Sequence, residues 1–117
     1  MTQSVFFKLV NIKAFCEHID ESLKRHSISE ASFGCDHIPY NAILFNVLKI
    51  GIFIGRLPNE FIGRNDTLRW ALIRETGNKI EHDYMNLLPA EIWKIATHDI
   101  PALRSFCEQT ITNTENT

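Results

Sequence analysis

The sequence predicts an all-α protein, an antiparallel helical bundle of four main helices plus one short helix. Apolar residues recur every three or four positions over long segments, prolines and glycines separate those segments, and no stretch shows the alternation typical of a strand. A chain of 117 residues suits one domain. We expect this domain to span residues 1–112, followed by a flexible polar tail over 113–117.

The first helix is predicted over residues 4–26. One face carries apolar residues at spacings of three and four: Val5, Leu9, Ile12, Cys16, Ile19 and Leu23. Lysines and acidic residues occupy the opposite face, as expected for a helix with one side on the core. Residues 27–36 form a polar connection around Gly34.

The second helix is predicted around residues 42–54, with Pro39 in its first turn and Asp36 or His37 near its cap. Its sequence is apolar nearly all round, so it must be buried on several sides, in the bundle centre or against another subunit. A segment of thirteen residues is too short to cross a bilayer, and we expect no membrane contact.

The remaining elements follow from turn signals and caps. Residues 55–66 are predicted as a loop, and Asp66 or Thr67 as the cap of a third helix that ends near residue 84. Pro89 opens a short helix. Asp99 is expected to cap the last helix, with Pro101 in its first turn.

Composition excludes several classes of protein. The net charge of −2 argues against a nucleic-acid coat, and three widely spaced cysteines argue against a secreted disulfide framework. No export signal is visible, so we expect a cytoplasmic protein. The two Cys-x-His pairs (Cys16 with His18, Cys35 with His37) lack further ligands at metal-binding spacing. We therefore expect neither a metal site nor a cofactor.

The most informative segment lies in the third predicted helix. Arg74, Asn78 and His82 are spaced at i, i+4 and i+8 and share one line on the helix surface. A cation, an amide and an imidazole on one line can contact a phosphate and move protons. The simpler alternative is a solvated face, with Glu75 and Lys79 forming an ordinary ion pair.

A family resemblance bears on this choice. The pattern Asn78-x-x-x-His82-x-Tyr84, followed by Trp93 and by Asp99-Ile100-Pro101-x-Leu103, resembles the HepT-like branch of the HEPN superfamily. Upstream features agree: the segment from Asp36 to Ala42, the Ile50-Gly51 step and Asp66-x-x-x-Trp70. The resemblance covers nearly the whole chain and implies a HEPN-like bundle.

The resemblance also implies a function. Family members are homodimers that pair their motif helices across a cleft and cleave RNA without a metal, as toxins encoded beside a minimal nucleotidyltransferase antitoxin called MntA. His82 matches the catalytic histidine, Asn78 matches the polar residue of the motif, and Arg74 is a third candidate catalytic residue. Tyr84 matches the tyrosine that MntA-type antitoxins modify with AMP. An added anion two residues from His82 would repel an RNA phosphate.

Two positions depart from the family pattern. Gly77 stands where the family motif has arginine, and Ile52-Phe53 stand where the family often has Glu-Ala. An arginine at position 77 would stabilise charge on the phosphate, whereas Gly77 would permit close helix packing. Two functions therefore stay open: an active ribonuclease toxin, or a non-catalytic dimer that binds a nucleotidyltransferase.

The charges are unevenly distributed along the chain. Residues 1–55 are neutral, residues 56–79 carry five basic and three acidic groups, and residues 80–117 carry two basic and six acidic groups. The positive excess therefore coincides with the loop before the motif and the first half of the motif helix. We expect any RNA binding to be modest and sensitive to salt.

Overall fold

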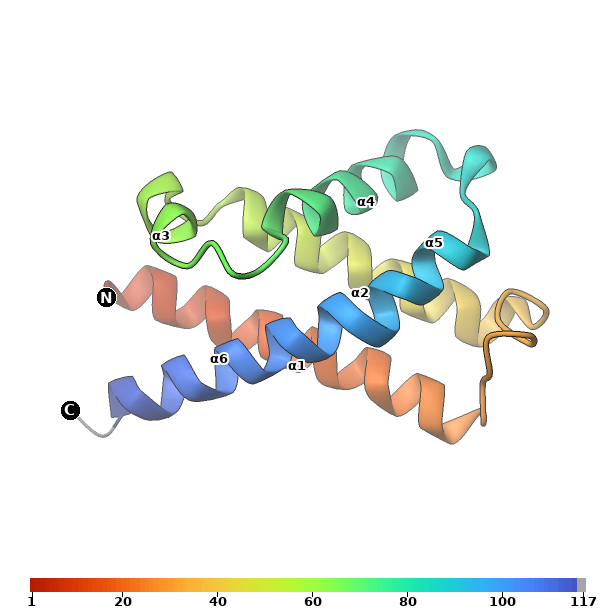
Figure 1. Cartoon of the computed structure of the whole chain (residues 1–117), viewed down its shortest axis with the longest axis horizontal. Helices are drawn as coiled ribbons and strands as arrows, with labels where there is room; N and C mark the ends of the chain where they lie inside the picture. Colours follow the sequence, from red (N-terminus) through yellow and green to blue (C-terminus); the bar gives the residue numbers. More distant parts are fainter. Residues whose placement is uncertain (116–117) are drawn as a thin grey trace.

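The protein is an all-α bundle, as predicted, and its computed structural model describes residues 1–115 (Figure 1). The long helices are α1 (Gln3–Arg25), α2 (His37–Gly55), α4 (Trp70–His82) and α6 (Ile100–Glu115). Shorter elements are α3 (Asn59–Arg64), a 3₁₀ turn (Tyr84–Asn86), α5 (Pro89–Lys94) and a π turn (Ile95–Asp99). Among the described residues no strand occurs.

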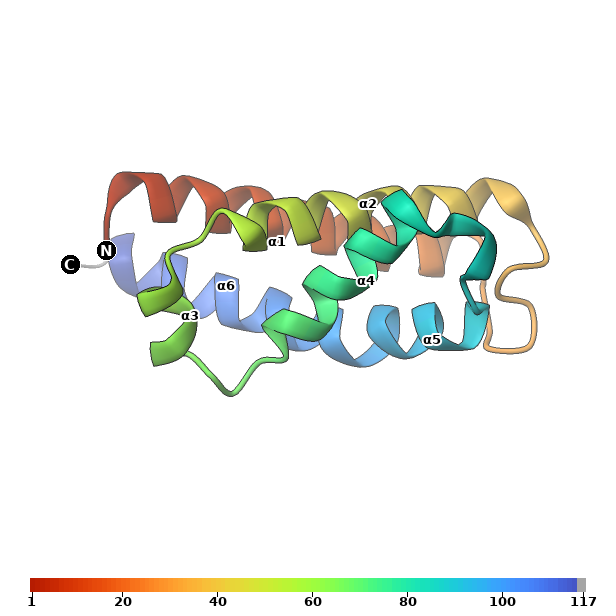
Figure 2. The same cartoon turned by 90° about the horizontal axis from the view of Figure 1, so that it is seen from above.

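Helix α1 lies between α2 and α6, and α4 packs on α2 (Figures 1 and 2). Figure 2 shows α1 and α2 side by side, with α5 and α6 below them and α4 crossing between the two levels. The apolar face predicted for α1 forms much of the core, and Leu9, Ile12, Cys16 and Ile19 are fully buried. The first and last described helices thus enclose one side of the core, and α4 closes the other.

Side-chain caps set the starts of the first two helices. The backbone N–H of Val5 donates to the Thr2 hydroxyl at 3.1 Å, and that of Ile38 donates to the Asp36 carboxylate at 3.0 Å. Each cap satisfies a backbone donor that has no partner within its helix. The prediction of Asp36 as a cap, with Pro39 in the first turn, is confirmed.

Helix α2 is longer than its apolar stretch suggested. It has 19 residues, and by length and composition alone it could cross a membrane. The prediction that this helix is too short to span a bilayer is therefore wrong. The central helix of a bundle has the same composition. Seven of its residues are buried in this fold: Pro39, Ile43, Leu44, Val47, Ile50, Gly51 and Ile54.

The connection between α2 and α4 differs from the predicted loop. Residues 59–64 form the short helix α3, and α4 begins at Trp70 without a side-chain cap, so neither Asp66 nor Thr67 caps it. The indole N–H of Trp70 donates to the Asn65 carbonyl at 2.8 Å, and its ring packs edge-on against Phe106. This buried tryptophan therefore holds the start of α4, as expected of a packing anchor.

The predicted role of Asp99 is also wrong. Helix α5 continues through the π turn into α6, so no helix begins there and Asp99 caps nothing. Its buried carboxylate instead accepts two hydrogen bonds of 2.8 Å from the Arg69 guanidinium, which raises the pKa of Arg69. Pro101 lacks an N–H group, and the wider π turn before it gives its ring room, so the helix continues.

Helix α6 continues to Glu115, three residues beyond the boundary expected for the domain. Residues 113–115 of the predicted tail are therefore helical, and residues 116–117 lie outside the described part of the chain. Its apolar residues face the core, with Ile100, Leu103 and Cys107 buried and Ile111 partly buried.

Candidate active site

Helix α4, which carries the motif, crosses α2 at two glycines. A Cβ atom added at Gly77 would lie 3.4 Å from the Cα of Gly51, and one added at Gly51 would lie 3.3 Å from the Cα of Gly77. The two backbones approach this closely because neither residue has a side chain. Gly77 therefore lies at the crossing of the two helices, as the sequence suggested, but the crowded position is Gly51, and a Cβ at Gly77 would make ordinary van der Waals contacts.

A second face of α4, adjoining the crossing, is open to solvent. Arg74, Asn78 and His82 are all exposed, and the side chain of His82 is 73% exposed. The shared line predicted from their spacing exists because Trp70, Ile73, Gly77 and Ile80 bury the other face. An RNA strand thus has direct access to the imidazole.

The ends of this line are far apart. With a rise of about 1.5 Å per residue, the backbones of Arg74 and His82 are separated by roughly 12 Å. The Arg74 side chain also lies toward the far end of α2, because a Cβ atom added at Gly55 would be 3.2 Å from its Nε atom. Within one protomer Asn78 and His82 form a pair near one site, and the Arg74 guanidinium lies elsewhere.

The acidic neighbours of the motif lie on different sides. The Glu81 carboxylate is 3.6 Å from the Nε2 atom of His82, which is a charge contact rather than a hydrogen bond. Lys79 pairs with Glu91 of α5 at 3.5 Å, so the pair predicted between Lys79 and Glu75 is not the one formed. These contacts leave the imidazole free to exchange protons with a ligand.

Tyr84 lies just beyond the motif helix. It begins the 3₁₀ turn after α4, and its ring is 49% exposed. Its hydroxyl donates a hydrogen bond of 3.0 Å to the Asn41 side-chain oxygen of α2. This contact holds the hydroxyl at the surface, two residues from His82. Asn41 was not anticipated, because no local pattern links residues 43 positions apart.

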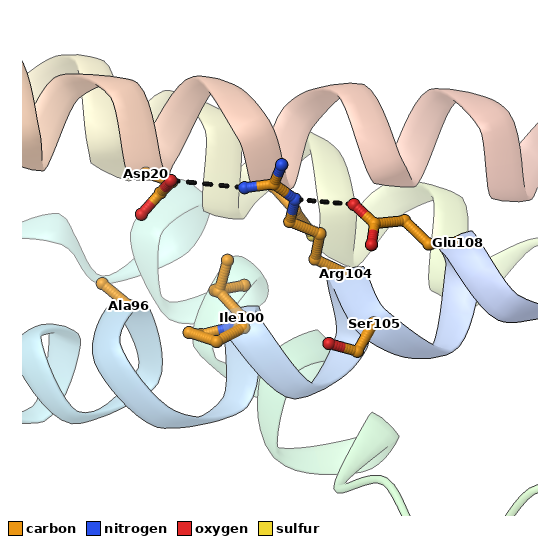
Figure 3. Close-up of a pocket in the computed structure, with 8 residues that line it drawn as sticks. Asp20, Ala96, Ile100, Arg104, Ser105 and Glu108 are labelled. Atoms are coloured by element: carbon orange, nitrogen blue, oxygen red, sulfur yellow. Dashed lines mark hydrogen bonds and ion pairs between the residues drawn. The ribbon is translucent and has the colours of Figure 1, made fainter.

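A hollow of about 290 Å³ between α1 and α6 is a competing candidate (Figure 3). Its only cation is Arg104, whose guanidinium contacts Asp20 at 3.2 Å and Glu108 at 2.9 Å. Those carboxylates raise the pKa of Arg104 and neutralise it, and burial raises the pKa of the Cys16 thiol. The hollow therefore offers neither a free cation nor a reactive thiolate.

The described residues contain no group of three or more His, Cys, Asp or Glu side chains placed to hold a metal ion. The exposed face of α4 presents an imidazole, an amide and the Arg74 guanidinium.

Comparison with known families identifies this arrangement. The family described as Ribonuclease HepT-like matches residues 12–110, which include every helix from most of α1 to the greater part of α6. This chain belongs to the HepT-like ribonuclease family. The searches of curated proteins and of solved structures gave no match.

As a HepT-like ribonuclease, the protein has an all-α fold consistent with the HEPN class, and the family implies an RNA substrate. The sequence had located the α4 face by its spacing. It had not located Gly55 or Asn41, the α2 residues that position Arg74 and Tyr84. Gly51 and Gly55, four residues apart in α2, could have indicated that another helix packs closely there. They do not indicate which helix it is.

Proposed function

We propose that this protein is the toxin of a prokaryotic type VII toxin–antitoxin pair, a cytoplasmic, metal-independent endoribonuclease. The observation that carries the proposal is the exposed imidazole of His82 on α4, in a chain of the HepT-like ribonuclease family. Histidine changes its protonation state near neutral pH, so it can serve in turn as base and acid.

The proposed reaction is cleavage through the ribose of the RNA itself. His82 takes the proton of a 2′-hydroxyl, and the freed oxygen attacks the adjacent phosphorus. The bond from phosphorus to the 5′-oxygen of the next nucleotide breaks, and that oxygen leaves with the proton that His82 returns, which gives a 2′,3′-cyclic phosphate and a 5′-hydroxyl. Asn78, one turn before His82 on the same exposed face, has an amide that donates hydrogen bonds to the phosphate oxygens. Arg74 supplies positive charge to the same RNA strand.

We propose that the active form is a homodimer. Ile38, Phe45 and Ile52 recur every seven residues on the outer face of α2, and they are 65%, 54% and 41% exposed. An apolar row of this kind beside a polar motif favours contact with another protein surface. A second copy fits because a two-fold axis brings the same row against itself and places two motif helices near one cleft.

Neutralisation is proposed to occur at Tyr84. Its hydroxyl is exposed and held by Asn41, so a nucleotidyltransferase of the MntA type can reach it. An AMP group there adds a bulky anion two residues from His82, which repels the RNA backbone. Tyr84→Phe removes the acceptor oxygen, so the variant should stay toxic when the nucleotidyltransferase is co-expressed.

The direct test of the proposed reaction is RNA cleavage by the purified protein without added metal and with chelator. We expect cleavage by the parent, and loss of at least about 100-fold in rate for His82→Ala, the scale of one general acid–base group. His26→Ala, an exposed histidine at the end of α1, is the matched control and should retain activity. Cleavage that survives His82→Ala would refute the proposed role.

A second candidate function is favoured by Gly77. The family arginine is absent at this position, and the nearest upstream arginine on this face, Arg74, lies over Gly55. The protein would then be a non-catalytic dimer that binds a minimal nucleotidyltransferase. No cleavage by the parent, together with cleavage by Gly77→Arg, would favour this function.

A further inference from the structure

The positive segment 56–79 contains five basic residues, and three of them form ion pairs with acidic side chains. Arg64 lies 3.4 Å from Glu60, Arg69 lies 2.8 Å from Asp99, and Lys79 lies 3.5 Å from Glu91. Arg56 and Arg74 are both exposed, and within the described part of the chain neither side chain makes a hydrogen bond or an ion pair. The unpaired positive charges of this segment are therefore these two guanidinium groups, and its acidic residues outside the ion pairs are Asp66 and Glu75.

The two arginines lie near the corner where α2 ends and the first turns of α4 pass: Arg74 by contact with Gly55, and Arg56 by following Gly55 in the chain. Gly55, the last residue of α2, leaves room for the Arg74 side chain, whose Nε, Cζ and Nη2 atoms would lie within 3.4 Å of a Cβ there. Arg56 follows Gly55 directly and caps the same helix. The carboxyl end of a helix carries partial negative charge, so it favours cations at this corner.

The corner also has a hollow beneath the Arg74 side chain. A cavity of about 140 Å³ is lined by Arg74 and by one further polar side chain, Asn59; its other lining residues are Ile54, Leu57, Ile62, Trp70 and Ala71. An apolar floor lowers the local dielectric constant and strengthens the attraction of Arg74 for an anion. The Asn59 amide adds a hydrogen-bond donor that a phosphate oxygen accepts from.

The distance from this corner to His82 allows one RNA strand to contact both. The backbones of Arg74 and His82 are roughly 12 Å apart, which equals three or four nucleotides of a stacked strand at about 3.4 Å per nucleotide. The Arg74 side chain extends toward Gly55, away from His82, so the separation of the two bound phosphates is at least this large. One RNA strand running along α4 therefore reaches both places.

We infer that Arg56 and Arg74 form a phosphate-binding subsite, which binds the RNA backbone at least three nucleotides from the phosphate at His82. The inference rests on the proposed ribonuclease function and gives Arg74 a positioning role. The subsite fixes where the strand lies on α4, and so which phosphate faces the imidazole. It accounts for RNA binding by a chain whose net charge is −2.

The test measures binding without cleavage, in the His82→Ala background. Fluorescence anisotropy with a labelled twelve-nucleotide RNA is recorded from 50 to 200 mM salt. We expect Arg56→Gln and Arg74→Gln each to weaken binding by about threefold to tenfold. Each should also lower the slope of log K against log salt by about 0.7, the value for one single-strand phosphate contact.

Two controls separate the subsite from general charge. Lys94→Gln on α5 removes the same charge from an exposed position and should leave the slope unchanged. A dinucleotide cannot span from His82 to the corner, so its weak binding should not depend on Arg74. Thermal melts and light-scattering masses show whether each variant keeps its fold and oligomeric state.

Several outcomes would overturn the inference: unchanged slopes for both arginine variants, an equal effect of Lys94→Gln, or a dimer that dissociates in Arg74→Gln. The last would make Arg74 an interface residue. A His82→Ala parent that does not bind RNA at all would overturn it as well. RNA binding that depends on Arg74 in a wild-type protein that cleaves nothing would leave the subsite standing and refute the catalytic proposal alone.

Discussion

The crossing of α2 and α4 at Gly51 and Gly77 yields a quantitative prediction from a double-mutant cycle. A Cβ atom at position 77 would meet backbone atoms of α2 at 3.4, 3.5 and 3.6 Å, which is ordinary van der Waals contact. A Cβ atom at position 51 would meet α4 backbone at 3.3 Å, slightly tighter than usual. Each methyl group fits alone because the opposite residue is glycine.

The magnitudes follow from helix propensity and packing. Alanine is better than glycine inside a helix by about 1 kcal/mol. We expect Gly77→Ala to stabilise the protein by about 0.5–1 kcal/mol, and Gly51→Ala to have an effect near zero because crowding offsets the gain. In the double variant the two methyl groups compete for one space, and overpacking costs about 1–3 kcal/mol. The coupling energy should therefore be about 1–3 kcal/mol.

The assay is thermal unfolding followed by circular dichroism on the parent, both single variants and the double variant. For a chain of this length 1 kcal/mol corresponds to about 4 °C in Tm, so the double variant should melt about 4–12 °C below the additive value. Gly63→Ala in α3 is the control, since a Cβ there meets nothing within 4 Å. Additive effects at positions 51 and 77 would refute the close crossing.

Three further predictions concern single features of the fold. Asp99→Ala should lower Tm by several degrees, because it leaves the start of α4 without its ion pair to the π turn, and melts at pH 7 measure this. In the native protein at pH 8, iodoacetamide should modify Cys35 alone by mass spectrometry, since burial raises the pKa of Cys16 and raises that of Cys107 to about 12. Because the folded-state pKa values of these two thiols are raised, their contribution to stability is full below about pH 8.5 and is lost as the pH rises above it. Trp70→Phe should cost about 1–2 kcal/mol in urea unfolding, because the Asn65 carbonyl loses its buried donor.

The helices with one apolar face were predictable from the sequence, because periodicity reports which side is buried. The face of α1 that starts with Val5 and the buried face of α4 both follow this rule. The cap at Asp36 was also predictable, since it depends on a residue two positions away.

The remaining errors come from contacts between distant residues. Asp99 has the chemistry of a cap, but its partner Arg69 lies 30 residues away, and no local pattern reports that pairing. The six residues of α3 were read as a loop because a helix that short has little stability of its own and depends on its surroundings. At the site, the α4 face was predictable from its spacing. The position of the Arg74 side chain against Gly55 and the contact of Tyr84 with Asn41 could be known only from the three-dimensional fold.

The two glycines of the crossing differ in what the fold requires of them, and this bears on the function. A side chain at position 51 is crowded by the backbone of α4, so Gly51 has a packing reason. At position 77 the packing reason for glycine is weaker, because a Cβ added there would make only ordinary van der Waals contacts. A glycine at this position also lowers the stability of the helix by about 1 kcal/mol relative to alanine. Packing therefore does not explain the loss of the family arginine at this position. Position 77 is buried and has room for a Cβ only while Gly51 is retained, so the longer arginine side chain must turn out of the crossing. Thermal melts therefore have to show first that Gly77→Arg folds, and Gly77→Arg with Gly51→Ala should be destabilised. Comparing RNA cleavage by the parent and by the folded Gly77→Arg variant then measures what the arginine alone contributes, about 100-fold or more if it stabilises charge on the phosphate.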